Sequence, residues 1–346
     1  MMKQIKKENE THKTSRKRCL VTGGYGFAAS YLIKLLLEKG MEVDIIVRRN
    51  SDNFRHKKLG IVGHRNLSIY YGDMTDTDFV RSVIIDTQPS IIYNLAAIMY
   101  VQDSWDIPQM TFETNTLVVL NILMTMTNLT VRCRLVQAGT SEEYGEVLES
   151  EVPIFETNKL RPKSPYAVSK VAAEHLCKIF AKEYNLDIVV TRAFNHVGRM
   201  QMKELVIPAF ARRVVRAYEF GDDIEHGNLD AIRDFTSIED IVEAYRLVGT
   251  IDFDDDSNYR VFNICSGVKN SMTMGKILDI MIEYVRFKYD VKYIPVLHQS
   301  YYRPNDVKLL VGNCIKLRSL TGWNPEKKLS NIIVDMLEEA FEEYES

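Results

Sequence analysis

Two short segments of this sequence carry side chains suited to redox chemistry on a sugar. One is Gly139-Thr140-Ser141-Glu142, and the other is Tyr166-Ala167-Val168-Ser169-Lys170. Together they supply a hydroxyl, a carboxylate, a phenol and an ammonium group. A phenol has a pKa of about 10 and is a weak base at neutral pH unless positive charge nearby lowers that pKa. Lys170 would supply such charge, so Tyr166 could take a proton from a sugar hydroxyl as hydride leaves the same carbon.

Glu142 adds an acid-base group that a simple alcohol oxidation does not need. Oxidation uses the Tyr166 phenol, the Lys170 ammonium and the Thr140 hydroxyl. An additional carboxylate indicates a second proton transfer at a neighbouring carbon, as in an elimination or an epimerisation. Two alternatives stay open: the Tyr-x-x-x-Lys spacing arose by chance, and Glu142 or Glu143 faces solvent.

The tyrosine and the lysine need a helix that begins just before them. Ser164-Pro165 is a good N-cap and first-turn pair, so a helix is predicted over Pro165–Tyr184. Tyr166 and Lys170 are four residues apart, which places both side chains on one face of that helix. Thr140 lies at the end of a predicted strand, from which its hydroxyl could reach the same reacting oxygen.

A glycine-rich turn near the start of the sequence predicts a dinucleotide site. The strand Cys19–Thr22 runs into Gly23-Gly24-Tyr25-Gly26-Phe27-Ala28-Ala29 and then into an amphipathic helix that ends near Gly40, and Phe27 is among the expected cofactor contacts. Gly23 and Gly26 would let the backbone approach a pyrophosphate at the helix N-terminus, where N–H groups and the helix dipole favour anions. The alternative is a tight turn that binds nothing, and the strand-turn-helix context argues against it.

The residues after the second strand favour NADP as the cofactor over NAD. The strand Val43–Val47 is followed by Arg48 and Arg49, and the first carboxylate beyond them is Asp52. An arginine here accommodates the 2′-phosphate of NADP, whereas an acidic residue would bind the ribose hydroxyls of NAD. The alternative is that either arginine simply lies on the surface. Further cofactor contacts are expected from residues that follow the third and fourth strands: Asp73, Met74, Leu95, Ala96 and Ala97.

Short β-branched runs alternate with segments of helical periodicity, which predicts an α/β fold with a doubly wound parallel sheet, the Rossmann arrangement. The predicted strands are Cys19–Thr22, Val43–Val47, Leu67–Tyr71, Ser90–Asn94, Arg134–Gln137 and Ile188–Arg192. The predicted helices are Ala28–Glu38, Asp76–Asp86, Met110–Met126 and Pro165–Tyr184. Beyond residue 195 the alternation breaks, and turn-rich segments separate the remaining helices from isolated strands such as Arg260–Ile264.

We therefore expect three parts in the chain. Residues 1–16 should form a flexible basic extension, residues 17–195 an NADP-binding Rossmann domain, and residues 196–346 a smaller mixed α/β lobe that binds the substrate. Some strands and helices are expected to be exchanged between the two lobes. No Pro-rich linker separates them, so they should pack closely.

Composition and charge exclude several classes of protein. With 346 residues, 46% of them hydrophobic, the chain can bury a large core, and no stretch approaches the ~18 apolar residues of a membrane span. The net charge is −3 although the first 18 residues are strongly basic, so the rest is acidic and no nucleic-acid partner is expected. The basic segment lacks the apolar stretch of a signal peptide. Five cysteines without a C-x-x-C pair indicate a reduced, cytoplasmic setting and no metal site.

From about Lys17 to Tyr344 the sequence resembles the extended short-chain dehydrogenase/reductase family. Within that family it is similar to the GDP-mannose 4,6-dehydratases and to the related GDP-4-keto-6-deoxymannose reductases. The dehydratase-like segments are Val47-Arg48-Arg49-Asn50-Ser51, Asn53-Phe54, Tyr71-Gly72-Asp73, Gln88-Pro89, Tyr93-Asn94-Leu95-Ala96-Ala97 and Thr140-Ser141-Glu142. The segments that look at least as much like the reductases are Glu142-Glu143-Tyr144-Gly145, Phe194-Asn195-His196-Val197-Gly198 and Gly322-Trp323-Asn324-Pro325.

The resemblance implies a GDP-sugar 4,6-dehydratase, a lyase of deoxysugar biosynthesis. A GDP-4-keto-6-deoxy-sugar reductase, or a 4-oxidising or epimerising relative, is the alternative. Tyr166 and NADP would oxidise the C4 hydroxyl, Glu142 would remove the C5 proton as the C6 hydroxyl leaves, and hydride would return to C6. Ser141 stands where many dehydratases have an acidic aspartate, so Glu142 would serve both proton transfers. The family's nucleotide-sugar contacts map onto Ser104, Asn195, Arg233 and Arg303.

The resemblance leaves the sugar and the oligomer open. The segment after His196, Val197-Gly198-Arg199-Met200-Gln201, departs from the dehydratase pattern, so GDP-mannose or a GDP-linked heptose is expected. In this family two helices often form a dimer interface, and the arginine-rich loop after the second strand can build tetramers, which implies a homodimer or a homotetramer. The apolar residues on the two corresponding helices include Leu117, Leu120, Leu123, Val168, Leu176 and Phe180.

Overall fold

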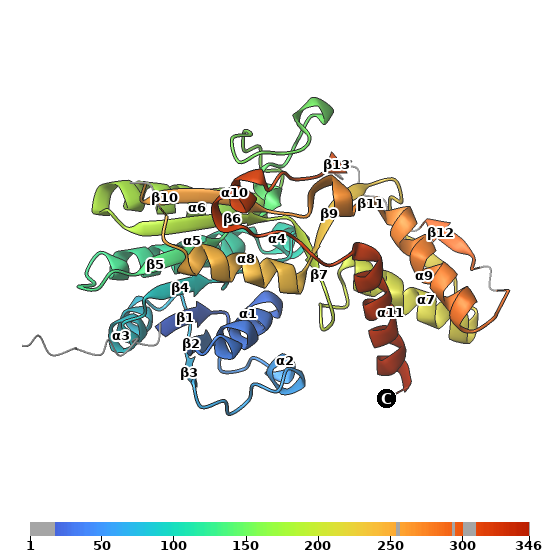
Figure 1. Ribbon diagram of the computed structural model, residues 1–346, viewed down its shortest axis with the longest axis horizontal. Helices are drawn as coiled ribbons and strands as arrows, with labels where there is room; N and C mark the ends of the chain where they lie inside the picture. The colour runs from blue at the N-terminus through green and yellow to red at the C-terminus, as the bar shows by residue number, and fades with distance from the viewer. Residues whose placement is uncertain (1–17, 254–256, 293–294, 300–308, 346) are drawn as a thin grey trace, which may run out of the picture.

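The computed structural model describes residues 18–253, 257–292, 295–299 and 309–345, so the predicted extension at residues 1–16 lies outside it. A parallel sheet of seven strands, in the order β10-β6-β5-β4-β1-β2-β3, forms the larger part (Figure 1). Its strands are β1 (Arg18–Thr22), β2 (Glu42–Val47), β3 (Leu67–Tyr71), β4 (Ile91–Asn94), β5 (Arg134–Ala138), β6 (Asp187–Ala193) and β10 (Tyr259–Ile264). The six strands predicted before residue 195 and the doubly wound sheet are confirmed.

Helices cover both faces of this sheet, which is why its strands are almost continuously apolar. The helices on one face are α1 (Phe27–Glu38) and α8 (Ile238–Thr250). Those on the other are α3 (Thr77–Thr87), α5 (Pro108–Met126) and α6 (Pro165–Tyr184). Side chains alternate along β1, so Cys19 and Val21 pack into the first core and Leu20 into the second.

A smaller mixed α/β body follows, as predicted, and it lies at one end of the large sheet (Figure 1). In its four-stranded sheet, β9 (Ile232–Ser237) pairs with β7 (Asn195–Val197), β11 (Ser271–Thr273) and β13 (Leu309–Leu310). A separate pair joins β8 (Ile224–His226) to β12 (Leu297–Gln299). The helices α7 (Val206–Phe220), α9 (Met274–Lys288) and α11 (Leu329–Glu345) enclose its core. Spacings of three and four residues place Ile207, Phe210, Ala211 and Val214 on one buried face of α7.

The strand expected at Arg260–Ile264 forms, but the prediction that it is isolated is wrong. As β10 it pairs in parallel with β6 and becomes an edge strand of the large sheet. Phe262 and Ile264 pack in the same core as α1 and α8, although β10 and α8 both follow the smaller body's first strands in the sequence. A short apolar run has the same local pattern in either sheet, so its partner depends on long-range packing.

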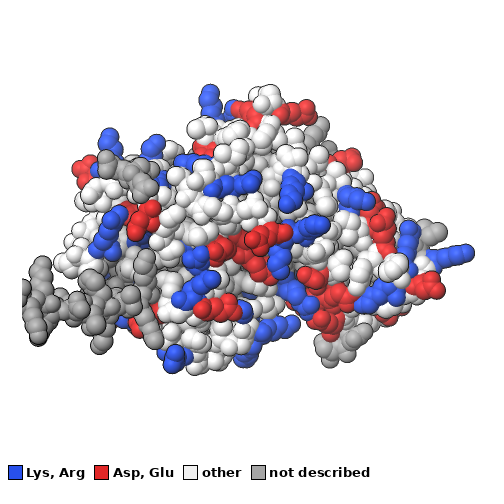
Figure 2. Space-filling model, viewed as in Figure 1, with Lys and Arg blue, Asp and Glu red and all other residues white. Residues whose placement is uncertain are grey.

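The remaining elements are short. They are α2 (Phe54–Lys58), α4 (Asp103–Asp106), α10 (Ile315–Thr321) and the 3-10 turns η1 (Ser141–Glu143), η2 (Glu149–Glu151) and η3 (Gly267–Asn270). Within the described ranges, no helix is long and apolar enough to cross a membrane. Lysine, arginine and carboxylate side chains are intermingled over the face shown in Figure 2.

Because every strand of the large sheet runs in parallel, the carboxyl ends of the strands meet at one edge. The segments that follow these ends begin with Gly23 after β1, Arg48 after β2, Leu95 after β4 and Gly139 after β5. The sheet topology thus gathers segments that are distant in the sequence along a single edge.

Candidate active site

The glycine-rich turn after β1 has the shape of an anion-binding loop. Gly23 has a φ of +66°, and a Cβ added there would lie 3.1 Å from the Cα atom of Ala96. A Cβ at Gly26 would lie 3.0 Å from the carbonyl oxygen of Gly23. Gly26 is also the N-cap of α1 and supplies no side chain to cap it, so the first-turn N–H groups point toward the open turn. This arrangement fits the pyrophosphate of a dinucleotide.

A buried hydroxyl holds the loop after β4 against this turn. Thr22 accepts hydrogen bonds from the N–H groups of Leu95 at 3.1 Å and Ala96 at 3.0 Å. It donates to Asn94 at 2.6 Å, and Asn94 in turn donates to Gln137 at 2.7 Å. The ends of β1, β4 and β5 are therefore joined by hydrogen-bonded side chains, which fixes the backbone that leads into Ala97. Neither Thr22 nor Gln137 is predicted for the site from the sequence pattern.

The arginines expected at the ribose end are exposed and follow β2 directly. Arg48 lies near Asp73, whose pKa is lowered mainly by hydrogen bonds from the N–H and hydroxyl of Thr75, both at 2.8 Å, and also by the Arg48 charge. Arg49, the next residue in the sequence after Arg48, is also exposed, whereas Met74 is buried. A guanidinium and a carboxylate thus stand together where the adenosine half of a cofactor would end.

Tyr166, Lys170 and Thr140 come together at the start of α6. Ser164 caps this helix by accepting the N–H of Ala167 at 3.1 Å, as the sequence predicts. The Lys170 ammonium donates to the carbonyl oxygen of Ala138 at 2.9 Å and lies 5.9 Å from the centre of the Tyr166 ring. Thr140 forms a hydrogen bond with the Tyr166 phenol.

Burial shifts the pKa values of both catalytic candidates on α6. It raises the pKa of the Tyr166 phenol, and the Thr140 hydrogen bond opposes that rise. Burial lowers the pKa of Lys170 to about 8. An ammonium whose pKa is near neutrality beside a phenol suits a tyrosine that must give up and regain a proton.

The turn η1 presents Glu142 beside the phenol. Thr140 is the N-cap of this turn and accepts the Glu142 N–H at 3.2 Å. Glu142 is half-buried and near enough to raise the pKa of Tyr166, while Ser141 is buried. Glu143 does not face solvent, since none of its surface is exposed. The carboxylate singled out for the second proton transfer is therefore within electrostatic range of the Tyr166 phenol.

The residues expected to contact the substrate differ in their burial and in their hydrogen bonds. Asn195 on β7 donates to the carbonyl oxygen of Asp234 at 3.4 Å, and Arg233 lies on the neighbouring strand β9. The hydroxyl of Ser104 is buried and donates to the Val101 carbonyl oxygen at 2.6 Å. The fourth candidate, Arg303, lies outside the described residues.

Asn115 is a positioning residue that the sequence analysis missed. From α5 it donates to the Ser169 hydroxyl at 2.9 Å and to the Ile98 carbonyl oxygen at 3.1 Å, and it accepts the Ile98 N–H at 2.8 Å. It therefore ties the helix that carries Lys170 to the loop after β4. The sequence gives little signal for it, because Thr111, Asn121 and Thr125 are also polar residues on the buried side of α5.

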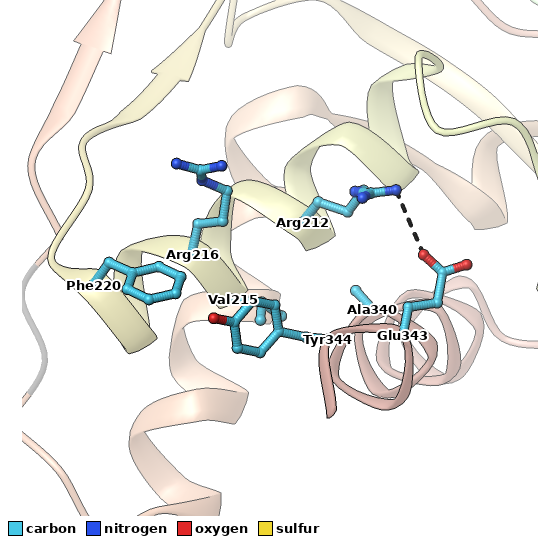
Figure 3. A pocket seen from close by; sticks show the side chains of 7 residues that line it. All are labelled: Arg212, Val215, Arg216, Phe220, Ala340, Glu343 and Tyr344. Atoms are coloured by element: carbon cyan, nitrogen blue, oxygen red, sulfur yellow. Dashed lines mark hydrogen bonds and ion pairs between the residues drawn. The ribbon is translucent and has the colours of Figure 1, made fainter. Parts of the chain in front are cut away.

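A separate pocket of about 170 Å³ lies between α7 and α11 in the smaller body (Figure 3). Arg212 pairs with Glu343 at 3.5 Å on one side, while Phe220 and Tyr344 meet edge to face on the other. None of the predicted site residues lines this pocket. The catalytic candidates and this hollow are thus different places in the molecule.

Known proteins resemble this chain over almost its full length. The family model described as GDP-mannose 4,6 dehydratase matches residues 20–336. The GDP-mannose 4,6 dehydratases of Cricetulus griseus and Homo sapiens are 33% and 32% identical to it, and each match covers 93% of this chain and 91% of the relative. The solved structure of UDP-glucose 4-epimerase from Thermus thermophilus, in complex with NAD, is 27% identical with a TM-score of 0.79 and covers 94% of this chain and 99% of its own.

Proposed function

This chain belongs to the GDP-mannose 4,6-dehydratase family, and we propose that it is an NADP-dependent hydro-lyase that makes a 4-keto-6-deoxy sugar from GDP-mannose or a GDP-linked manno-heptose. One observation carries the proposal. The hydrogen-bonded Thr140 and Tyr166 and the ammonium of Lys170 stand beside the carboxylate of Glu142 at the edge where the cofactor turn lies.

Tyr166 begins the reaction by accepting the proton of the C4 hydroxyl, while Thr140 holds the same oxygen. A nicotinamide cofactor held at the glycine turn after β1 would supply the hydride acceptor for C4 and the hydride donor for C6, so the overall reaction would be redox-neutral. The Lys170 ammonium favours the ionised phenol that this step requires.

Glu142 then carries the elimination. The C4 ketone acidifies the neighbouring C5 proton, which the carboxylate removes. The resulting carboxylic acid gives a proton to the C6 hydroxyl, which departs as water. With Ser141 next to it in place of a second carboxyl, one glutamate serves as base and then as acid. As C6 is reduced, C5 regains one proton, which balances the one taken by Tyr166.

The choice of NADP rests on the end of β2. Arg48 and Arg49 follow the strand directly and are exposed, so a guanidinium can bind the 2′-phosphate in bidentate fashion. The Arg48 charge also lies near Asp73. A carboxylate directly after β2 would instead favour NAD, by binding its free 2′-hydroxyl, but the first charged residues after this strand are the two arginines.

The loop after β7 motivates the heptose as a second candidate substrate. Met200 has a φ of +63°, its N–H donates to Glu339 at 2.9 Å, and its carbonyl oxygen accepts from Arg55 at 3.0 Å. This loop departs from the dehydratase pattern and adjoins Asn195, so its shape would bear on the length of the sugar accepted.

A mass-spectrometric assay tests the function. Purified protein is incubated with GDP-mannose and, separately, with a GDP-linked manno-heptose, with catalytic NADP and no added NADPH. Loss of one water from either substrate, with solvent deuterium at C5, is expected. Failure to change both substrates would overturn the proposal. Stoichiometric consumption of NADPH on a GDP-4-keto-6-deoxy sugar would instead identify a reductase. The Glu142-Glu143-Tyr144-Gly145 segment, which also resembles the reductases, favours that alternative.

We further propose that the protein acts in the cytoplasm as a homodimer or homotetramer. All five cysteines are buried and form no disulfide, which suits a reducing compartment.

The oligomer is proposed from exposed apolar side chains on two helices. Leu117 on α5 and Val168 on α6 are exposed, whereas Leu123 belongs to the core. An exposed apolar surface of this kind suits a contact between copies. Sedimentation of wild type and Val168→Glu would test it, because a charge in that contact should shift the protein toward monomer.

A further inference from the structure

A buried carboxyl, Glu143, lies directly behind the catalytic turn and takes no part in the steps above. None of its surface is exposed. Its Oε1 atom accepts the N–H of Thr140 at 2.8 Å and closes a capping box around η1. Space for it depends on Gly139, because a Cβ added there would lie 2.6 Å from the same oxygen. Glu143 thus holds the backbone of the residue whose hydroxyl meets Tyr166.

The cation nearest to Glu143 is engaged by a different carboxylate. Arg192 on β6 donates from Nε at 2.9 Å and from Nη2 at 2.5 Å to the two oxygens of Glu174. Its remaining Nη1 donates to the Tyr144 hydroxyl at 3.0 Å. The distance from Arg192 Nε to Glu143 Oε2 is 3.8 Å, which is too long for a hydrogen bond.

Glu143 and Glu174 are neighbouring buried carboxyl groups, and each changes the pKa of the other. Two ionised carboxylates offer only acceptors and repel each other, so this buried pair favours sharing one proton. Burial raises the pKa of Glu174, but the bidentate Arg192 guanidinium outweighs burial and lowers it. Burial and the charge of Glu174 raise the pKa of Glu143 well above its ordinary value, although the Arg192 charge opposes that rise. The Oε2 atom of Glu143 meets no N–H or hydroxyl donor, as expected if it bears the shared proton itself.

The protonation of Glu143 affects the catalytic pair on α6. A negative charge on Glu143 would raise the pKa of both Tyr166 and Lys170. For the tyrosine this would oppose formation of the phenolate. A neutral Glu143 still accepts the hydrogen bond from the Thr140 N–H but does not raise the pKa of Tyr166. The titratable and charged groups that face this carboxyl pair are Tyr166, Lys170 and Cys177 on α6, Arg192 on β6, Tyr144 at the end of η1, and Tyr259 on β10.

We propose that Glu143 is a positioning residue, held as a neutral acid by Glu174, that fixes Thr140 beside Tyr166 without adding negative charge to the site. The inference deepens the proposed function and rests on it for its kinetic test. It assigns a purpose to a residue that touches neither the sugar nor the cofactor, and to the ion pair between Arg192 and Glu174 behind it.

Three variants test the proposal through the pH profile of turnover. Glu143→Gln keeps a neutral acceptor for Thr140, so the pH at which turnover rises should stay in place with only a small loss of kcat. Glu143→Leu removes the acceptor and should lower kcat by about 100-fold, because a displaced catalytic group is costly. Glu174→Gln frees Arg192 to pair with an ionised Glu143. That negative charge would raise the pKa of Tyr166, so the pH at which turnover rises should be higher than in wild type. A shifted profile in Glu143→Gln, or wild-type kcat in Glu143→Leu, would overturn the proposal.

A measurement independent of turnover separates this inference from the proposed function. Hydrogen exchange of the Thr140 amide should be slow in wild type and in Glu143→Gln and fast in Glu143→Leu. Infrared spectra near neutral pH should show a protonated carboxyl band that Glu143→Gln removes. If the sugar assay fails while both signals appear, the substrate assignment is wrong and the positioning arrangement stands. If the band is absent from folded wild type, the neutral acid is refuted whatever the substrate.

Discussion

The proposed redox half of this site, around Tyr166 and Lys170, and the proposed sugar half, around Asn195 and Arg233, are held in place by different means. Around Tyr166 and Lys170, hydrogen bonds made by buried groups such as Thr22 and Asn115 connect the strands β1 and β5, the helices α5 and α6 and the loop after β4. Around Asn195, the contacts are longer, at 3.4 Å to the Asp234 carbonyl oxygen, and the adjoining loop carries a residue with positive φ. The region around Tyr166 and Lys170 is therefore held by more buried hydrogen bonds than the region proposed to bind the sugar.

The largest effect should come from the redox half. Tyr166→Phe removes the proton acceptor and should lower kcat by about 1,000-fold or more while leaving cofactor binding intact. Turnover and NADP binding by fluorescence would be measured together. Tyr93→Phe is the matched control, because the buried Tyr93 hydroxyl has no hydrogen-bond partner. Substantial turnover in Tyr166→Phe would show that Tyr166 is not the proton acceptor and that the redox step does not depend on this half of the site.

The next effect concerns pH and again belongs to the redox half. Burial lowers the pKa of Lys170 to about 8, so the ammonium is present below that pH and is lost above it. Without the cation the phenolate is less favoured, so turnover should fall as pH rises past 8. Lys170→Arg, whose guanidinium stays charged, should be slower but should lack this alkaline fall. An unchanged alkaline fall in that variant would assign the titration to another group.

A change in the sugar half should act on binding. Arg233→Ala should raise KM for the GDP-sugar by about tenfold or more, since a hydrogen-bonded charge contact would be lost, while kcat changes little. Arg233→Lys should recover part of the affinity. If kcat fell as much as kcat/KM in Arg233→Ala, the arginine would act in the transition state and the contrast between the halves would weaken.

A smaller effect is expected at the adenosine end. Arg48→Ala should weaken NADP binding by about tenfold and leave NAD binding nearly unchanged, because only NADP carries the 2′-phosphate. Arg65→Ala, at an exposed arginine in the segment before β3, is the control. Equal losses for both cofactors would show that Arg48 does not read the phosphate.

The smallest effect is on stability. Met200 adopts a left-handed conformation that costs a non-glycine residue about 1 kcal/mol. Met200→Gly should therefore raise the free energy of unfolding by no more than about 1 kcal/mol. Chemical denaturation would measure it. A clear loss of stability would show instead that the Met200 side chain contributes more through packing than its backbone conformation costs.

The sequence by itself determined the local elements and the redox group. Strand and helix periodicity, the turn at Gly23 and Gly26, and the spacing of Tyr166 and Lys170 each depend on residues close together in the chain. Such patterns reflect backbone sterics and which face of an element is apolar, and both can be read from a short window.

Tertiary structure alone decided the long-range partners. It placed β10 in the large sheet beside β6, set Asn115 against Ser169, and buried Glu143 between Thr140 and the ion pair of Glu174 with Arg192. A carboxylate has the same local pattern whether it faces water or another carboxyl. Only packing fixes its burial and its neighbours, and these determine whether it carries a proton.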